Sequence, residues 1–177
     1  VSAPDRTGQG MADSEKPRGP IAIDSIPWSE DGQGERFAMR YRVLSDTRKD
    51  GRKIGIAYEE LPPGKQSVPF HYHLLEEEHL IALEGEATLR LGEERHRIKA
   101  GDYVGFPAGQ RAGHCLVNEG NAPFRYIVIG DHEPNDVCVY PDSNKVLVRK
   151  LDRAIFRDGQ RLDYWDGERA DEPVKRT

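Results

Sequence analysis

The sequence predicts an all-β fold in which the strands form either a closed barrel or a sandwich of sheets. Short apolar segments follow one another between turn residues, with almost no helical periodicity. Ala87, Leu89 and Leu91 alternate with Thr88 and Arg90, and this two-residue period is typical of a strand with one buried face. Closely spaced strands joined by glycine-rich turns favour a closed or sandwiched arrangement.

The predicted strands lie between residues 36 and 129. The first turn falls at Asp50-Gly51, and Gly85 marks a later one, because glycine supplies the backbone freedom that tight turns require. After the last strand, residues 143–156 offer a place for a short helix. The expected strands are 36–44, 53–61, 68–73, 78–83, 87–91, 95–98, 103–106, 111–117 and 123–129.

The chain of 177 residues is long enough for one domain with a substantial core. Residues 1–20 are rich in Gly, Pro, Ser, Asp and Lys and offer no periodic apolar face, so we expect a mobile N-terminal tail. Residues 158–177 are mostly charged and form a C-terminal extension, in which Tyr164-Trp165 is expected to pack onto the barrel or a partner subunit. The barrel domain is therefore assigned to residues 21–157.

Charge and hydropathy exclude several classes of partner. The 26 basic and 31 acidic residues are interspersed and give a net charge of −5, so no nucleic-acid partner is expected. Apolar runs such as 126–129 are too short to cross a bilayer, and residues 1–20 lack the apolar stretch of a signal peptide. We therefore expect no membrane partner and a cytoplasmic protein, with Cys115 and Cys138 as buried structural thiols.

Three histidines and one glutamate form a candidate metal site. His71 and His73 lie two residues apart on a predicted strand, which directs both imidazoles to the same face. Glu78 follows after a short turn, where its carboxylate can reach that face, and His114 lies on a later strand. Three nitrogens and one oxygen suit a first-row divalent metal and leave positions open for water or substrate.

Two segments resemble the two sequence motifs of the cupin superfamily. Residues 64–85 contain a glycine, His-x-His, a spacer, Glu and a further glycine seven positions later. Residues 101–118 contain Gly, Pro-Ala-Gly, His and Asn in the order of the second motif. The resemblance, which extends from about residue 37 to 129, implies a double-stranded β-helix, or jelly-roll barrel. It also implies one divalent transition metal (manganese, iron, nickel or zinc) held by His71, His73, Glu78 and His114.

Two spacings depart from the usual motifs. Six residues separate Gly64 from His71 where five are usual, and four separate Gly109 from His114 where two are usual. A one-residue change would turn a strand side chain to the opposite face, whereas the two-residue insert before His114 preserves its orientation.

The neighbouring polar residues are expected outside the ligand set. Glu76 and Glu77 compete with Glu78, but the seven-residue spacing to the glycine favours Glu78, and Glu77 is expected to be solvated. Of the other histidines, His79 is expected to face outward, His96 to lie on the barrel wall, and His132 to lie in an exposed turn.

Function follows from the metal, because the sequence contains no nucleophile elbow, phosphate-binding loop or His-Glu-x-x-His helix. The first hypothesis is a metal-dependent enzyme of dioxygenase, isomerase or lyase type that acts on a small carboxylate or sugar-derived molecule. The second is a non-catalytic module that binds or senses such a molecule on the same ion. Both need a small-molecule ligand. By strand position, the pocket could be lined by Tyr58, Phe106, Arg111 and Tyr126.

The resemblance to small cupins also implies a homodimer, and we expect this chain to form one. Residues 37–44 could form a strand that is shared with the partner subunit.

Overall fold

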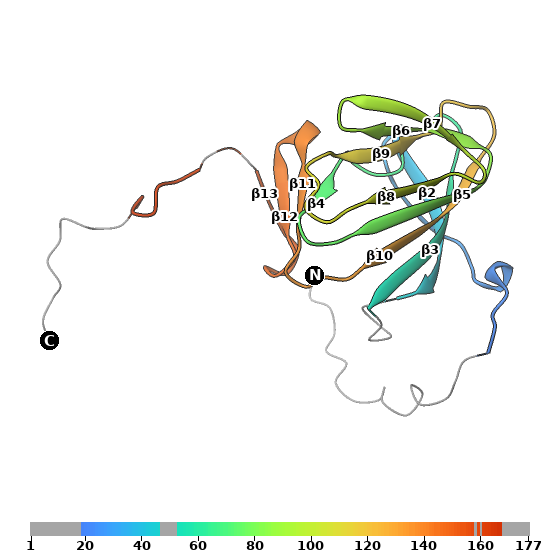
Figure 1. The fold of residues 1–177 in the computed structure, drawn as a ribbon, viewed down its shortest axis with the longest axis horizontal. Helices are drawn as coiled ribbons and strands as arrows, with labels where there is room; N and C mark the ends of the chain where they lie inside the picture. Colours follow the sequence, from blue (N-terminus) through green and yellow to red (C-terminus); the bar gives the residue numbers. More distant parts are fainter. Residues whose placement is uncertain (1–18, 47–52, 158, 160, 168–177) are drawn as a thin grey trace, which may run out of the picture.

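A computed structural model describes residues 19–46, 53–157, 159 and 161–167 and shows an all-β fold (Figure 1). The predicted turn at Asp50-Gly51 and most of both predicted tails lie outside these residues. Helical structure in the described part is limited to two 3₁₀ turns, η1 (Ile23–Ser25) and η2 (Pro141–Ser143). Among the described residues, no helix is long and apolar enough to span a bilayer.

The strands form three antiparallel sheets. The largest has the order β1-β2-β3-β10-β5-β8 and is built from Ser29–Gln33, Phe37–Ser45, Ile54–Leu61, Phe124–Asp131, Glu78–Glu84 and Tyr103–Phe106. A second sheet has the order β7-β6-β9 and contains Glu94–Lys99, Glu86–Leu91 and His114–Val117. The third has the order β13-β12-β11-β4 and contains Ala154–Arg157, Lys145–Val148, Val137–Tyr140 and Tyr72–His73.

The hydrophobic core draws on the six-stranded and the three-stranded sheet. On β10, Tyr126 pairs with Ala82 of β5 and Glu59 of β3, so these three side chains lie on the inner face. Phe124 and Tyr126 are almost completely buried and stack with their ring centroids 5.2 Å apart. The cluster of buried apolar residues comprises Leu61, Leu80, Ala82, Ala87, Leu89, Ile98, Phe106, Leu116, Phe124 and Tyr126.

Most of the predicted strands between residues 36 and 129 are confirmed with bounds that differ by one or two residues. The strand expected at 68–73 is reduced to Tyr72–His73, and Pro69 explains part of the difference because proline has no N–H for a strand ladder. The expected helix at 143–156 is wrong, since β12 and β13 form there. Leu147 pairs with Cys138 of β11, and this long-range pairing overrides any local helical tendency.

The C-terminal aromatic pair does not pack on the barrel in the described residues. Tyr164 is 83% exposed and Trp165 64% exposed, and their rings contact each other at a centroid distance of 4.7 Å. The expectation of a packed clasp within the chain is therefore wrong.

The strand that we expected to share with a partner, β2, is paired on both sides within its own chain. It lies between β1, which pairs with residues 37–41, and β3, which pairs with residues 40–45 across an irregularity between Val43 and Ser45. Within the chain, β1 occupies one edge of β2 over residues 37–41, and the sharing of this strand with a partner stays a prediction. The homodimer itself stays a prediction.

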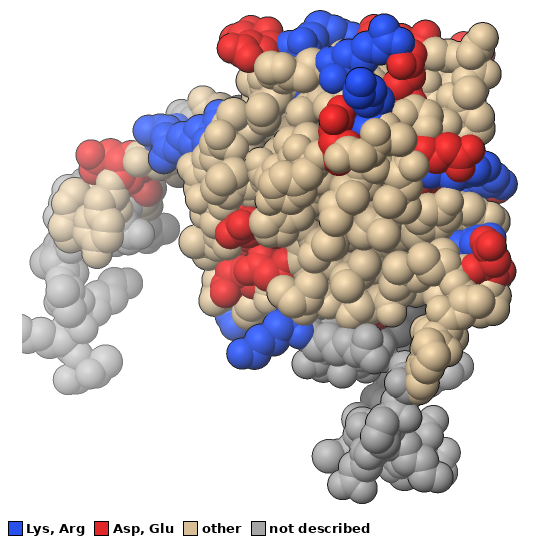
Figure 2. All heavy atoms as spheres, turned by 45° about the vertical axis from the view of Figure 1, so that its right-hand side comes forward, with Lys and Arg blue, Asp and Glu red and all other residues tan. Residues whose placement is uncertain are grey.

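The charged surface residues are mixed in sign. Figure 2 shows a face whose centre is largely uncharged, with basic and acidic side chains adjacent to one another around it. Several such neighbours form ion pairs, including Arg95 with Glu119 and Arg90 with Asp142. We expect no nucleic-acid partner because the charges are mixed in this way, and this expectation stays a prediction.

A fully buried asparagine joins the ends of several strands. The Asn118 side-chain nitrogen donates to the carbonyl oxygens of Leu61 at 2.9 Å and Ala122 at 2.8 Å. Its side-chain oxygen accepts from the Gly120 N–H at 3.0 Å. Asn118 therefore links the end of β3 to the turn between β9 and β10, and it has no exposed surface.

We expect Asn118→Ala to lower the free energy of unfolding by about 2 to 3 kcal/mol, because buried backbone groups lose their partners. Asn135→Ala is the matched control, since Asn135 is exposed and hydrogen-bonds to Glu133, two residues away; its effect should stay within about 0.5 kcal/mol. Urea unfolding of both variants measures the difference. Equal effects would contradict the role assigned to Asn118.

Candidate metal centre

Backbone pairing brings the two sequence motifs together. The His114 N–H donates to the His71 carbonyl oxygen at 2.7 Å, and the His71 N–H donates to that of His114 at 3.2 Å. His73 follows on β4, two residues along, so its imidazole returns to the face of His71. Glu78 opens β5 and reaches the same place from the large sheet. The four predicted ligand residues therefore converge.

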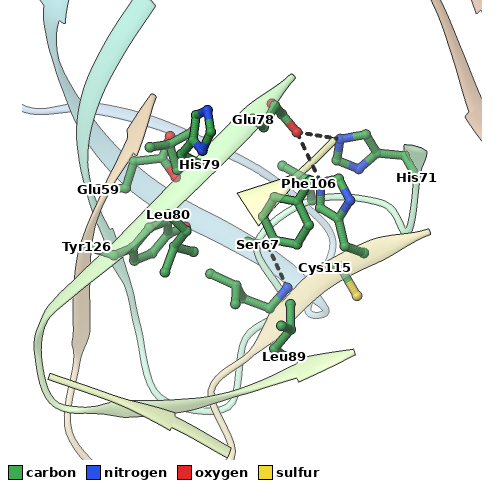
Figure 3. Close-up of a pocket in the computed structure, with 14 residues that line it drawn as sticks. Glu59, Ser67, His71, Glu78, His79, Leu80, Leu89, Phe106, Cys115 and Tyr126 are labelled. Carbon is green, nitrogen blue, oxygen red and sulfur yellow. Dashed lines mark hydrogen bonds and ion pairs between the residues drawn. The ribbon is translucent and has the colours of Figure 1, made fainter. Parts of the chain in front are cut away.

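The Glu78 carboxylate lies at the centre of this cluster. Its Oε2 atom is 3.0 Å from Nε2 of His114 and 3.8 Å from Nε2 of His71 (Figure 3). Nε2 of His73 lies 3.7 Å from the same oxygen. A divalent ion bound at about 2.1 Å by each atom would hold neighbouring ligand atoms about 3.0 to 3.4 Å apart. The ligand atoms of His71, Glu78 and His114 lie within 4.8 Å of one another and fit one ion after small adjustments. His73 approaches the same Glu78 oxygen but lies in this range of His71 and Cys138, or of Glu76 and Asp136, instead, so it needs a larger adjustment to join the ion. The nitrogen and oxygen donors suit a first-row metal.

Two of the imidazoles are oriented by hydrogen bonds on their far side. His71 Nδ1 lies 2.8 Å from the Pro69 carbonyl oxygen, and His73 Nδ1 lies 2.6 Å from Asp136 Oδ2. Both partners are acceptors, so each Nδ1 carries the proton and each Nε2 presents its lone pair. A metal-binding histidine has this arrangement.

The electrostatics favour an ionised glutamate beside a neutral His71. Burial would raise the pKa of Glu78, but the hydrogen bond to His114 and the nearby imidazoles lower it to about 2. Burial and the adjacent His114 lower the pKa of His71 to about 4. Burial would lower the pKa of His73, but the hydrogen bond to Asp136 and the nearby carboxylates raise it. Near neutral pH, Glu78 is therefore a carboxylate and His71 has a free nitrogen lone pair, the forms that bind a cation.

The competing acids and the cysteines have other surroundings. Glu76 is buried and pairs with Arg149 at 2.5 Å, whereas Glu77 is exposed as expected. Cys138 could approach a metal beside His71 and His73, but burial raises the pKa of its thiol to about 12 and keeps it protonated. The Cys115 sulfur points away from the imidazoles (Figure 3).

The remaining histidines differ in part from expectation. His79 alternates with Glu78 and Leu80 on β5 and lies 2.8 Å from the Tyr103 hydroxyl, but it is only partly exposed and also borders the cavity beside the cluster. His96 is exposed beside Glu94 and does not form a barrel wall. The expectation of an exposed His132 is wrong, because its side chain is only 29% exposed and accepts a hydrogen bond from Arg149.

A cavity of about 150 Å³ adjoins the cluster. Its walls include Leu80, Leu89 and Val128, together with Phe106, whose ring stacks on His114 with centroids 3.8 Å apart. Of the four predicted lining residues, Phe106 and Tyr126 line the cavity. The other two are wrong: Tyr58 packs against Trp28 with ring centroids 5.5 Å apart, and Arg111 is exposed.

Glu59 is a functional candidate that the sequence analysis missed. It lines the same cavity and forms a hydrogen bond with the buried hydroxyl of Tyr126. Figure 3 shows Glu59 and His71 on opposite sides of the cavity. The alternation of Ala57, Glu59 and Leu61 along β3 was the available signal, because it places one acid on an otherwise apolar inner face.

Burial raises the pKa of Glu59 to about 7; the hydrogen bond from Tyr126 opposes this shift, and the negative charge of Glu78 adds to it. The two acids that line the cavity therefore have different protonation states over much of the neutral range. Glu78 is ionised, while Glu59 exchanges its proton near pH 7.

Sequence comparison gives a consistent family assignment. Residues 57–130 match the family described as Cupin domain. A curated protein of Streptomyces glaucescens, tetracenomycin polyketide synthase protein TcmJ, is 33% identical over 107 residues, which cover 60% of this chain and 70% of that protein.

Solved structures give the same result. A sugar phosphate isomerase from a cupin superfamily of Silicibacter pomeroyi has a TM-score of 0.69 and 26% identity, over 82% of this chain and 98% of that one. A protein of Acidithiobacillus ferrooxidans, whose proposed assignment is sugar phosphate isomerase, has a TM-score of 0.62 and 32% identity, over 70% of this chain and 81% of that one.

The raised pKa of Glu59 predicts a pH-dependent effect of Glu59→Gln on stability. The folded protein retains the proton up to about pH 7, whereas the unfolded chain releases it near pH 4.5, so the wild type loses stability between these values. Glutamine does not ionise. From pH 4 to pH 8 the stability difference should therefore shift in favour of the variant by up to about 3 kcal/mol.

Urea unfolding of chelator-treated protein at both pH values measures this shift. Glu60→Gln is the matched control, because hydrogen bonds and charges from Arg40 and Arg125 outweigh burial and lower the pKa of Glu60. Its shift should have the opposite sign. A pH-independent effect of Glu59→Gln would show that Glu59 titrates normally in the folded protein.

Proposed function

This chain belongs to the cupin superfamily, and we propose that it is a metal-dependent enzyme acting on a small carboxylate or sugar-derived molecule. One observation carries the proposal. The convergent atoms of His71, His73, Glu78 and His114 adjoin a cavity that also contains Glu59, an acid able to exchange a proton near neutral pH. A metal site and a proton carrier in one small cavity are the basic components of an active site.

The ligand set suits manganese, iron, nickel or zinc, with the four side chains supplying three nitrogens and one oxygen. Four protein ligands leave coordination positions for water or a substrate oxygen. When bound, such an ion supplies Lewis-acid polarisation of a carbonyl or carboxylate oxygen, or dioxygen activation if it is iron.

The chain's own residues perform the other tasks. Phe106 fixes the plane of the His114 ring by stacking, and the apolar walls restrict the water that can enter. Glu59 accepts a proton from a substrate carbon or hydroxyl and can return it, because its pKa of about 7 makes both forms accessible. Tyr126 donates to Glu59 and holds its carboxyl group in place.

Isomerisation is the reaction type best supported. It moves one proton between neighbouring carbons and one between the oxygens that these carbons carry. A single carboxyl group such as Glu59 can accept and return the carbon-bound proton, and the oxygen-bound proton can pass directly or through water. Two structures similar to this chain above 25% identity have sugar phosphate isomerase assignments. No Lys or Arg occurs among the described residues of the cavity wall, so the cavity itself suits a carbonyl or carboxylate portion rather than an enclosed phosphate group.

The metal proposal predicts that protein reconstituted with manganese, iron, nickel or zinc retains one divalent ion per chain after desalting. Glu78→Gln should weaken binding by at least about tenfold, because the amide lacks the negative charge at the centre of the imidazole cluster. Inductively coupled plasma mass spectrometry and chelator competition give stoichiometry and affinity.

Glu77→Gln is the matched control, since this neighbouring acid is exposed and contacts His79, not the cluster. Its metal content should equal that of the wild type. A wild type that holds no stoichiometric metal after reconstitution would overturn the proposed metal site.

The enzyme proposal predicts proton exchange between substrate and solvent. Metal-loaded protein, incubated in D₂O with hydroxy acids, keto acids, aldoses and sugar phosphates, should introduce deuterium next to a carbonyl in one of them, as followed by NMR. Glu59→Gln should lower the rate by about 10²- to 10⁴-fold without changing the metal content.

Aerobic incubation of the iron form with the same compounds, with oxygen consumption recorded, tests the dioxygenase variant. Tight binding of one compound by thermal shift, without exchange, oxygen use or product, would instead establish the non-catalytic binding module.

A further inference from the structure

A buried carboxylate from outside the matched cupin domain supports the metal centre. Asp136 lies in the turn before β11, beyond residues 57–130, and has no exposed surface. Its Oδ2 atom accepts a hydrogen bond from His73 Nδ1 at 2.6 Å. The partner imidazole of Asp136 is therefore one of the four candidate ligands.

The other oxygen of Asp136 is fixed by the backbone. Oδ1 accepts from the N–H of Leu75 at 3.0 Å and from the N–H of Glu76 at 3.3 Å. These residues form the turn between His73 and Glu78, so one carboxylate holds both a ligand side chain and the loop that separates two ligands. The orientation of Asp136 is determined, because each oxygen has its own donors.

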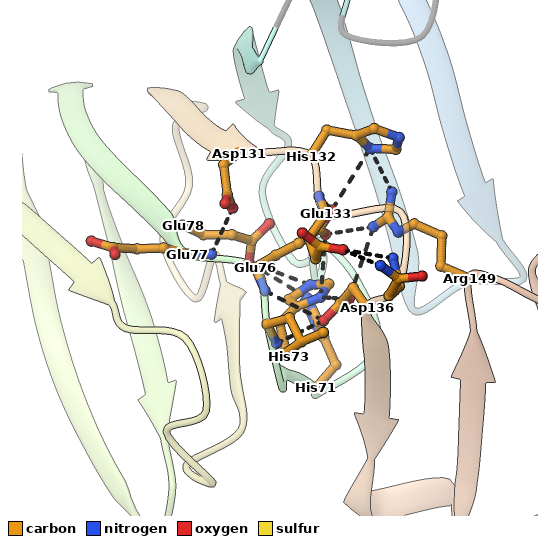
Figure 4. A network of polar contacts seen from close by, with 12 residues as sticks. His71, His73, Glu76, Glu77, Glu78, Asp131, His132, Glu133, Asp136 and Arg149 are labelled. Carbon is orange, nitrogen blue, oxygen red and sulfur yellow. Dashed lines mark hydrogen bonds and ion pairs between the residues drawn. The ribbon is translucent and has the colours of Figure 1, made fainter.

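An ion-pair network anchors this arrangement to the third sheet (Figure 4). Arg149, which directly follows β12, donates to Glu76 at 2.5 Å and to His132 Nδ1 at 2.9 Å. The Arg149 N–H donates to the Asp136 carbonyl oxygen at 3.0 Å. Three loops that are distant in sequence are therefore connected around the far side of His73.

We propose that Asp136 is a positioning residue of the metal centre, which fixes the proton of His73 on Nδ1 and thereby directs the Nε2 lone pair to the metal. This inference rests on the proposed metal site. It adds that residues next to the strands of the β13-β12-β11-β4 sheet help to orient a metal ligand. An anionic hydrogen-bond acceptor also increases the basicity of the imidazole, which strengthens its bond to a cation.

The geometry predicts how Asp136→Asn would fail. The asparagine oxygen should remain with the N–H groups of Leu75 and Glu76, which leaves its NH₂ group facing His73 Nδ1. A donor at this position requires Nδ1 to be an acceptor, so the imidazole proton moves to Nε2 and blocks the metal-facing nitrogen.

We expect Asp136→Asn to weaken zinc and manganese binding by about 10- to 100-fold, measured on the full chain by competition with a chromogenic chelator. Asp131→Asn is the matched control. Asp131 accepts from the Glu77 N–H of the same turn at 2.8 Å but forms no hydrogen bond with a ligand imidazole among the described residues, so the metal affinity of this variant should change by less than about threefold. Equal weakening in both variants would assign Asp136 to loop structure alone and overturn the inference.

A second measurement uses the wild type and does not depend on how the variant folds. Long-range ¹H–¹⁵N correlation spectra of zinc-loaded protein should show His73 protonated at Nδ1 and zinc-bound at Nε2. Zinc bound through Nδ1, or the absence of His73 from the zinc ligands, would overturn the inference. If the wild type binds no metal, the proposed function fails; if it binds metal and Asp136→Asn binds equally well, only the inference fails.

Discussion

The buried carboxylate of Glu78 is the constraint on which the site depends. An ionised carboxylate removed from water costs several kcal/mol unless donors or a cation compensate it. His114 Nε2, 3.0 Å from Oε2, supplies one such donor, and the Nε2 lone pairs of His71 and His73 at 3.8 and 3.7 Å leave a place for a cation. The three imidazoles come from different positions in the barrel. The strands that carry these side chains must therefore meet at one point, and a shift of a single residue in any of them would remove a partner.

The supporting contacts follow from that requirement. The His71–His114 backbone pair joins the two halves of the site, and Asn118, four residues after His114, secures the same strand at its other end. The ring of His71 is fixed by a backbone carbonyl and that of His73 by a carboxylate from the third sheet. The barrel strands bring the ligands together, and the neighbouring sheet determines how one of them is presented.

Strand parity explains what the sequence could reveal. The order and approximate bounds of the strands from β2 to β10, and the convergence of four side chains, depend on local alternation and on two short motifs, both visible in one chain. The preserved face of His114 follows from the same alternation, since Leu116 lies on its side and Cys115 on the other. Asp136 and Arg149 gave no local signal, because their roles arise only when loops separated by about sixty residues or more meet. Without that pairing, residues 143–156 carry an ambiguous pattern that a helix could also satisfy.

Two glutamates in one cavity illustrate how position assigns chemistry. Glu78 and Glu59 are the same residue type, and burial acts on both in the same direction, raising the pKa. The difference comes from their neighbours: imidazoles surround Glu78 and lower its pKa to about 2, whereas Glu59 has a single tyrosine hydroxyl and the negative field of Glu78, and its pKa is about 7. A carboxylate that stays charged is suited to hold a cation, and one that titrates near neutrality is suited to move protons.

The ionisation of Glu78 thus helps to produce the protonation state of Glu59, so the ligand cluster and the proposed proton carrier form one electrostatic unit. Because a bound cation would reduce the negative field of Glu78, the readiness of Glu59 to release its proton is coupled to occupancy of the metal site.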